Sequence, residues 1–169
     1  MADVLILCTG NAARSVMAAT SLSARRPDLD VATGGTLVVD GQPMSIRTRA
    51  AIEGVGLTIP RHASRQVHPP DLDDATLVVA LAPEHVEWVR RSHPPAAART
   101  LTLRRLVRDL PSADTLADQV AALDAHALEL EAWEEVVDPG GGEAAVFAAC
   151  AREIDDLVHQ LAPRLAPPR

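Results

Sequence analysis

Lysine and tyrosine are absent from the chain, and cysteine and phenylalanine are scarce. All 16 basic residues are arginine, a bias typical of high-GC coding that supports no functional conclusion. The two cysteines, Cys8 and Cys150, provide neither a disulfide framework nor a cluster of metal ligands. Cys150 falls in a helical pattern near the C-terminus, where we expect a small buried hydrophobic residue.

Long apolar runs and a positive net charge are also missing. No apolar stretch in the 169 residues is long enough to cross a membrane, and the length suits one domain with its own core. The net charge of −7 argues against nucleic acid or an anionic membrane as partners. The start, Met1-Ala2-Asp3, is too short and acidic for a signal peptide. We therefore expect a cytoplasmic enzyme whose affinity for anions is local.

The octapeptide from Cys8 to Ser15, C-T-G-N-A-A-R-S, is the most informative segment present. It follows the apolar run 4–7, so it would form a loop between a strand and a helix. Such a loop directs backbone N–H groups inward as an anion nest, and the helix adds its positive N-terminal end. Arg14 can hold two oxygens of a tetrahedral oxyanion in its planar fork. Cys8 beneath the anion would be largely thiolate, a nucleophile aimed at phosphorus.

The hydrophobic pattern predicts strands alternating with helices. Glycine pairs and proline indicate turns at 34–35 and 41–43, and the basic stretch 60–70 indicates a loop. Continuous apolar runs favour buried parallel strands, and helical spacing favours the segments between them. The expected strands are 3–7, 30–33, 75–81 and 99–103, and the expected helices are 14–26, 44–55, 83–91, 115–136 and 143–161.

This alternation predicts an α/β fold: a single domain with a four-stranded parallel sheet and helices on both faces. We assign residues 1–162 to the domain and expect the proline-rich tail, 163–169, to be disordered. Ligands of such sheets bind beyond the carboxyl ends of the strands, which is where the Cys8 loop falls.

Cys-x5-Arg-Ser after the first strand, with Asp-Pro about 130 residues later, resembles the low-molecular-weight protein tyrosine phosphatases. The resemblance covers nearly the whole chain. It includes the segments Thr33-Gly34-Gly35-Thr36, Gly41-Gln42-Pro43-Met44, His62-Ala63-Ser64-Arg65-Gln66 and Val137-Asp138-Pro139, the third strand with Glu84-His85, and Phe147 on the last helix.

The resemblance implies a phosphocysteine mechanism without metal or cofactor. Cys8 would be the nucleophile, Arg14 the oxyanion clamp, and Asp138 the acid that protonates the leaving oxygen and then activates water. Ser15 would donate a hydrogen bond to the thiolate, and His62 would pair with Asn11 to support the loop. The remaining implied residues are Thr9, Gly10, Ala12 and Ala13 around the bound phosphate, and Thr33 as a supporting residue.

Four departures from the family pattern narrow this interpretation. Ala13 stands where many members have a second cysteine, so oxidised Cys8 would need an external thiol. Val16 replaces a usual proline at a helix start, where we expect little effect. Gly140-Gly141 follow Asp-Pro, and Leu37-Val38-Val39 occupy the facing loop, where aromatic residues often stand. Aliphatic walls offer a phosphotyrosine ring less than aromatic walls do, so phosphomonoester hydrolysis is the safer description.

Two rival activities remain open from the residues. Arsenate reductases of this fold also carry Cys-x5-Arg; the thioredoxin-linked kind needs two further cysteines, whereas a kind that uses an external thiol needs only Cys8. A non-catalytic phosphate-binding module would need neither a nucleophile nor Asp138. The substrate could be a phosphorylated protein or a small phosphomonoester, and the oligomeric state is open.

Other polar residues carry no expected role. The remaining histidines show no spacing typical of metal sites, and we expect them at the surface. The acidic stretch 129–135 is expected to be the solvated face of a helix. The histidines in question are His68, His85, His93, His126 and His159.

Overall fold

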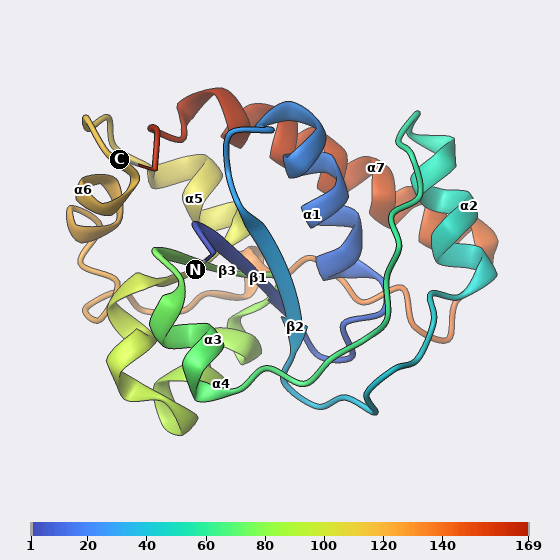
Figure 1. Ribbon diagram of the computed structural model, residues 1–169, viewed down its shortest axis with the longest axis horizontal. Coiled ribbons are helices and arrows are strands. Elements are labelled where there is room, and N and C mark those ends of the chain that lie inside the picture. Colours follow the sequence, from blue (N-terminus) through green and yellow to red (C-terminus); the bar gives the residue numbers. More distant parts are fainter. Residues whose placement is uncertain (1, 169) are drawn as a thin grey trace.

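The computed structural model describes residues 2–168 and confirms the four-stranded parallel sheet (Figure 1). The strand order is β2-β1-β3-β4. Cys8 at the end of β1 lies opposite Gly35, and Leu7 lies opposite Ala80 of β3. The chain leaves β1 to one side for β2 and later returns to its other side for β3, which places the Cys8 loop at the switch point of the sheet. The strands are β1 (Val4–Cys8), β2 (Val31–Gly35), β3 (Leu77–Ala80) and β4 (Thr100–Thr102).

Helices cover both faces of this sheet, as predicted (Figure 1). No described helix has the length and apolar character needed to cross a membrane. The α-helices are α1 (Arg14–Arg25), α2 (Ile46–Gly54), α3 (Pro69–Asp74), α4 (Pro83–Ser92), α5 (Leu103–Asp109), α6 (Leu116–Ala121) and α7 (Ala144–Leu161). The 3₁₀ helices are η1 (Pro94–Arg99), η2 (Ala132–Glu134) and η3 (Ala162–Arg164).

The two faces of β1 contribute to two separate cores, because successive strand residues point in opposite directions. Ile6 and Cys8 belong to the larger core, which also contains Ile154 of α7. Leu5 and Leu7 belong to the smaller core with Val89 of α4. All five residues of β1 are buried, which explains why the strand reads as a continuous apolar run.

Gly35 allows β2 to pass close to the Cys8 loop, residues 8–15. A Cβ atom at position 35 would lie 2.5 Å from the carbonyl oxygen of Thr9 and 3.0 Å from the backbone nitrogen of Asn11. The pair Gly34-Gly35 is therefore part of β2 rather than the predicted turn. Glycine is required here for close approach of two backbones.

The predicted helix over 115–136 is wrong. Helix α6 ends at Ala121, and the chain then turns at Asp124, which has a φ of 44°. Glu134 lies on η2 and is buried against Arg105, at 2.5 Å, and the hydroxyl of Thr102. The acidic stretch 129–135 is therefore not the solvated face of a helix, because one of its carboxylates, that of Glu134, is buried in an ion pair.

The disorder predicted for the tail is also wrong for residues 163–168; residue 169 lies outside the described part. Leu165 and Ala166 are buried, and the Ala166 N–H donates to the Gln119 side chain at 2.7 Å. The Leu116 N–H donates to the Pro167 carbonyl at 2.9 Å. Proline removes donors from this segment but leaves its carbonyls free to accept, and partners elsewhere in the fold use them. Sequence reasoning also missed α3 and α5, which are only six and seven residues long.

Candidate active site

Residues 8–15 form a loop from the end of β1 to the start of α1, beside a cavity of about 280 Å³. Helix α1 begins without a side-chain cap and without an acidic residue in its first turn. Its first N–H groups and its positive dipole end are therefore available to an anion. Residues from the loop, α2, the segment before α7 and α7 line the cavity: Cys8, Gly10, Ala12, Ala13, Arg14, Ser45, Thr48, Asp138, Gly140 and Phe147.

Cys8 lines this cavity, and its sulfur contacts Ser15. Its Sγ atom is 3.1 Å from Ser15 Oγ, and the Asn11 amide donates to the same Oγ at 2.9 Å. Because that oxygen already accepts from Asn11, its own proton is free to point at the sulfur. The arrangement can stabilise negative charge on Cys8.

Asn11 fixes the shape of the loop. Its φ is 49°, in the left-handed region that asparagine tolerates, and its side chain is fully buried. Asn11 Oδ1 accepts from the Arg65 N–H at 3.0 Å, and its backbone oxygen lies 2.6 Å from His62 Nε2. A carbonyl can only accept, so His62 Nε2 carries the proton. The expected contact between His62 and Asn11 is therefore present.

Arg14 joins the loop to Asp138 across 124 residues of sequence. Its buried guanidinium donates to the Val136 carbonyl at 3.0 Å and to Asp138 Oδ2 at 3.1 Å. The Asp138 side chain is 56% exposed, and its other oxygen accepts from the Gly140 N–H at 2.9 Å. The structure thus brings Cys8, Arg14 and Asp138 into one cavity, as expected from the sequence.

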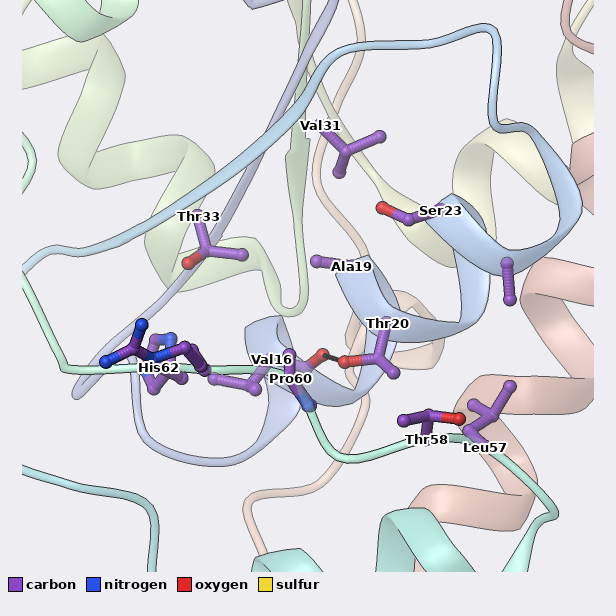
Figure 2. A pocket seen from close by; sticks show the side chains of 12 residues that line it. Val16, Ala19, Thr20, Ser23, Val31, Thr33, Leu57, Thr58, Pro60 and His62 are labelled. Atoms are coloured by element: carbon purple, nitrogen blue, oxygen red, sulfur yellow. Dashed lines mark hydrogen bonds between the residues drawn. The ribbon is translucent and has the colours of Figure 1, made fainter.

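Thr33 lies apart from this cavity. It lines a second one of about 450 Å³ between α1, β2 and residues 57–62, and Figure 2 shows it on β2 with its side chain toward that space. Of the residues expected at the Cys8 site, only Thr33 and His62 line the second cavity. Thr33 therefore does not join the reactive loop, because β2 reaches the loop only at Gly35.

Sequence reasoning missed the contact of His85 with the loop of residues 8–15. His85 is 1% exposed rather than at the surface, and its Nε2 lies 3.0 Å from Thr9 Oγ1, next to Cys8. Burial, with a smaller contribution from the positive charge of Arg14, lowers the pKa of His85 to about 3, so the ring is neutral. Its spacing could have revealed this, because His85 stands four residues before the buried Val89 on the inner face of α4.

Cys150 is buried, as expected. Burial, above all, raises the pKa of its thiol to about 12. It therefore stays protonated and behaves as a small core residue.

Fold and site together define a cysteine-dependent phosphatase, and comparison with known proteins identifies its family. The model of the low molecular weight phosphotyrosine protein phosphatase family matches residues 3–118. The chain belongs to this family.

Known phosphatases resemble the chain over nearly its whole length. The protein-arginine-phosphatase of Geobacillus stearothermophilus is 26% identical over 163 residues, which cover 96% of this chain and 95% of that protein. The structure of the YwlE arginine phosphatase from the same organism matches with a TM-score of 0.77, over 96% of this chain and 92% of that one. A low molecular weight protein tyrosine phosphatase from T. tengcongensis, 26% identical, matches with a TM-score of 0.75 over 96% and 98%.

Proposed function

We propose that Cys8, Arg14 and Asp138 hydrolyse a phosphate ester through a phosphocysteine intermediate. The observation that carries this proposal is the meeting of a thiol, a buried guanidinium and a half-exposed carboxyl in one cavity at an uncapped helix end. The loop N–H groups and Arg14 would bind the phosphate dianion and the charge that develops in the transition state. A phosphate oxygen would take the Arg14 donor now held by Asp138, freeing that carboxyl for proton transfer.

The first step transfers the phosphoryl group to sulfur. Cys8 Sγ attacks phosphorus as the bond from phosphorus to the leaving oxygen breaks, and Asp138 gives that oxygen its proton. In the second step Asp138 takes a proton from water, the water oxygen bonds to phosphorus, and the sulfur–phosphorus bond breaks. Ser15, 3.1 Å from Sγ, would stabilise the departing thiolate with a hydrogen bond.

Substitution at Cys8 and Asp138 tests these roles. We expect Cys8→Ser to abolish turnover of an aryl phosphate while circular dichroism shows an intact fold. We expect Asp138→Ala to slow esters with poor leaving groups about 10²-fold or more and activated aryl phosphates far less, because only poor leaving groups need the proton. Retained turnover in the first variant, or equal losses on both esters in the second, would contradict the mechanism. Turnover of arsenate with a small thiol, but of no phosphate, would favour a reductase instead.

Phosphorylated protein is the substrate class we propose, with phosphotyrosine and phosphoarginine as the two candidates. Phosphotyrosine is an ester; in phosphoarginine the phosphorus–nitrogen bond would break in place of the phosphorus–oxygen bond, and Asp138 would protonate the leaving nitrogen. Phosphoarginine is favoured by the likeness to the Geobacillus arginine phosphatase, and by a cavity lined by Ala12 and Gly140 with one aromatic residue, Phe147. Paired peptides that differ only in the phosphorylated residue would decide. A ratio of kcat/KM above about tenfold in either direction identifies the preferred residue.

We further propose that the protein is a cytoplasmic enzyme and that oxidised Cys8 is reduced by an external thiol. A free thiol is maintained in a reducing compartment. Position 13 carries alanine, so no cysteine stands within the loop to protect Cys8, and burial keeps Cys150 protonated. After mild peroxide treatment, activity should return with added glutathione and not on removal of the oxidant alone.

A further inference from the structure

Large exposed hydrophobic side chains gather in only two segments of the described chain, residues 37–46 and 137–146. Their exposed fractions range from 47% to 82%. We call these five residues the apolar rim: Leu37, Val39, Ile46, Val137 and Val146.

Four of the rim residues are connected to the reactive site. One makes a backbone hydrogen bond to the loop, and three are sequence neighbours of residues that line the cavity. The Leu37 N–H donates to the Thr9 carbonyl at 3.0 Å, beside Cys8. Ile46 follows Ser45, Val137 precedes Asp138, and Val146 precedes Phe147; Ser45, Asp138 and Phe147 all line the Cys8 cavity.

The two segments also meet each other. Arg47 of α2 lies 3.5 Å from Glu143, at the start of α7. In Figure 1 the loop that leads into α7 passes beside the start of α2. The rim residues therefore lie on the two segments that contribute Ser45, Asp138 and Gly140 to the cavity.

Exposed aliphatic clusters bordered by polar groups mark sites of contact with other molecules. A small phosphomonoester would fill the cavity of about 280 Å³ and leave the rim in water. A polypeptide that carries the phosphate would lay its neighbouring side chains across the rim. We infer that the rim binds apolar side chains that flank the phosphorylated residue of a polypeptide substrate. This inference rests on the proposed function.

Two phosphopeptides test the inference with the wild-type protein. Both carry the phosphorylated residue that the wild type prefers; one has leucine and valine on either side of it, and the other has serine and glycine. We expect kcat/KM to be roughly tenfold or more higher for the first, because burial of one or two aliphatic side chains is worth that much, and the gain should appear mainly in KM. A ratio near one in the wild type would overturn the inference.

Two double variants then assign the effect to the rim. We expect Leu37→Ser with Val39→Ser to bring the peptide ratio close to one while the inhibition constant of inorganic phosphate, which has no group that could reach the rim, is unchanged. Leu37→Met with Val39→Ile keeps the apolar surface and should keep the ratio. An unchanged ratio in the serine variant would overturn the inference.

Turnover of an aryl phosphate by the wild type distinguishes failure of this inference from failure of the proposed function. If the wild type does not hydrolyse an aryl phosphate, the proposed function is contradicted; if it does and the peptide ratio is near one, only the inference about the rim is. Sedimentation of the same proteins tests the other possible occupant of the rim. A dimer that the serine variant abolishes, with an unchanged peptide ratio, would assign the rim to a second copy of the chain and overturn the inference.

Discussion

His85 contacts the reactive loop from α4, while His62 contacts it from the segment before α3. The Thr9 hydroxyl lies 3.5 Å from Glu84 Oε1, with Thr9 as donor, and 3.0 Å from His85 Nε2. Thr9 then accepts from His85, so Nε2 carries the proton. His85 Nδ1 has no hydrogen-bond partner among the described residues. A buried acceptor without a partner costs about 1–3 kcal/mol, a cost that the contact with the loop can offset only in part.

Two substitutions of His85 distinguish the Nε2 contact from simple packing. Glutamine can place an N–H near the position of Nε2, whereas asparagine places its amide near Nδ1. We expect His85→Gln to keep kcat/KM for an aryl phosphate within about threefold, and His85→Asn to lower it by roughly tenfold, the equivalent of one lost hydrogen bond. Equal activity in both variants, at equal thermal stability, would contradict a role for the Thr9 contact.

The neutral state of His85 also predicts how acid affects stability. Its pKa is about 3 in the folded protein against an ordinary value of 6.5, so between these values the unfolded chain binds a proton that the folded chain does not. This contribution to stability is fully present above pH 6.5 and is lost as the pH falls toward 3. We expect urea unfolding to show a shallower decline between about pH 6.5 and 4.5 in His85→Gln than in the wild type. Parallel curves would contradict the assignment.

At the scale of elements, the connection between α6 and Asp138 is held by an ion pair and not by helix. Glu134 on η2 binds Arg105 of α5, and both side chains are buried. Two residues later, the Val136 N–H donates to the Leu81 carbonyl at 2.8 Å, and its carbonyl accepts from Arg14. The ion pair thus fixes the segment that delivers Asp138 to the loop.

Removal of Glu134 should weaken both the fold and the site. We expect Glu134→Ala to lower the free energy of unfolding by about 2 kcal/mol, because the buried Arg105 loses its 2.5 Å partner and keeps only the longer contacts with Asp109 and Glu131, at 3.5 and 3.6 Å. Turnover of esters with poor leaving groups should also fall, because Asp138 loses its support. Glu135→Ala, at the exposed neighbouring carboxylate, is the control and should change stability by less than about 0.5 kcal/mol in urea titrations. Equal effects of the two substitutions would refute the account.

The helices were predicted correctly where the buried residues recur with helical spacing over several turns. Helix α1 and helix α7 were predicted within a residue or two, since each places a long apolar stripe on the core. The residues over 115–136 have helical spacing too, but the chain turns at Asp124, and the burial of Glu134 depends on partners in α5 and β4 that local spacing does not contain. Short helices such as α5 give too few turns for a periodic pattern.

At the scale of the whole molecule, the C-terminal segment completes the larger core beside α6 (Figure 1). Arg26 from the end of α1 donates to the carbonyls of Ala162 and Leu165, and the Gln119 side chain binds both Arg164 and Ala166. The segment therefore ties the ends of α1, α6 and α7 together.

Truncation of one buried side chain in this segment should be costly. We expect Leu165→Ala to lower the free energy of unfolding by about 2–3 kcal/mol, because it leaves a cavity in the larger core. Pro163→Ala, at an exposed position of the same segment, is the matched control and should have little effect. A thermal unfolding midpoint that is the same for both variants would show that the segment does not stabilise the fold.

The sequence by itself determined the parallel sheet and the loop from Cys8 to Ser15 between a strand and a helix, because strand burial, loop chemistry and helix initiation are local properties. Asp138 was a candidate acid only through the resemblance to a known family. Only the tertiary structure decided the contact of Arg14 with Asp138, the burial of His85 against Thr9 and the exposure of the five apolar rim residues. These depend on the packing of segments that lie up to 124 residues apart, where desolvation and pairing set the state of each group.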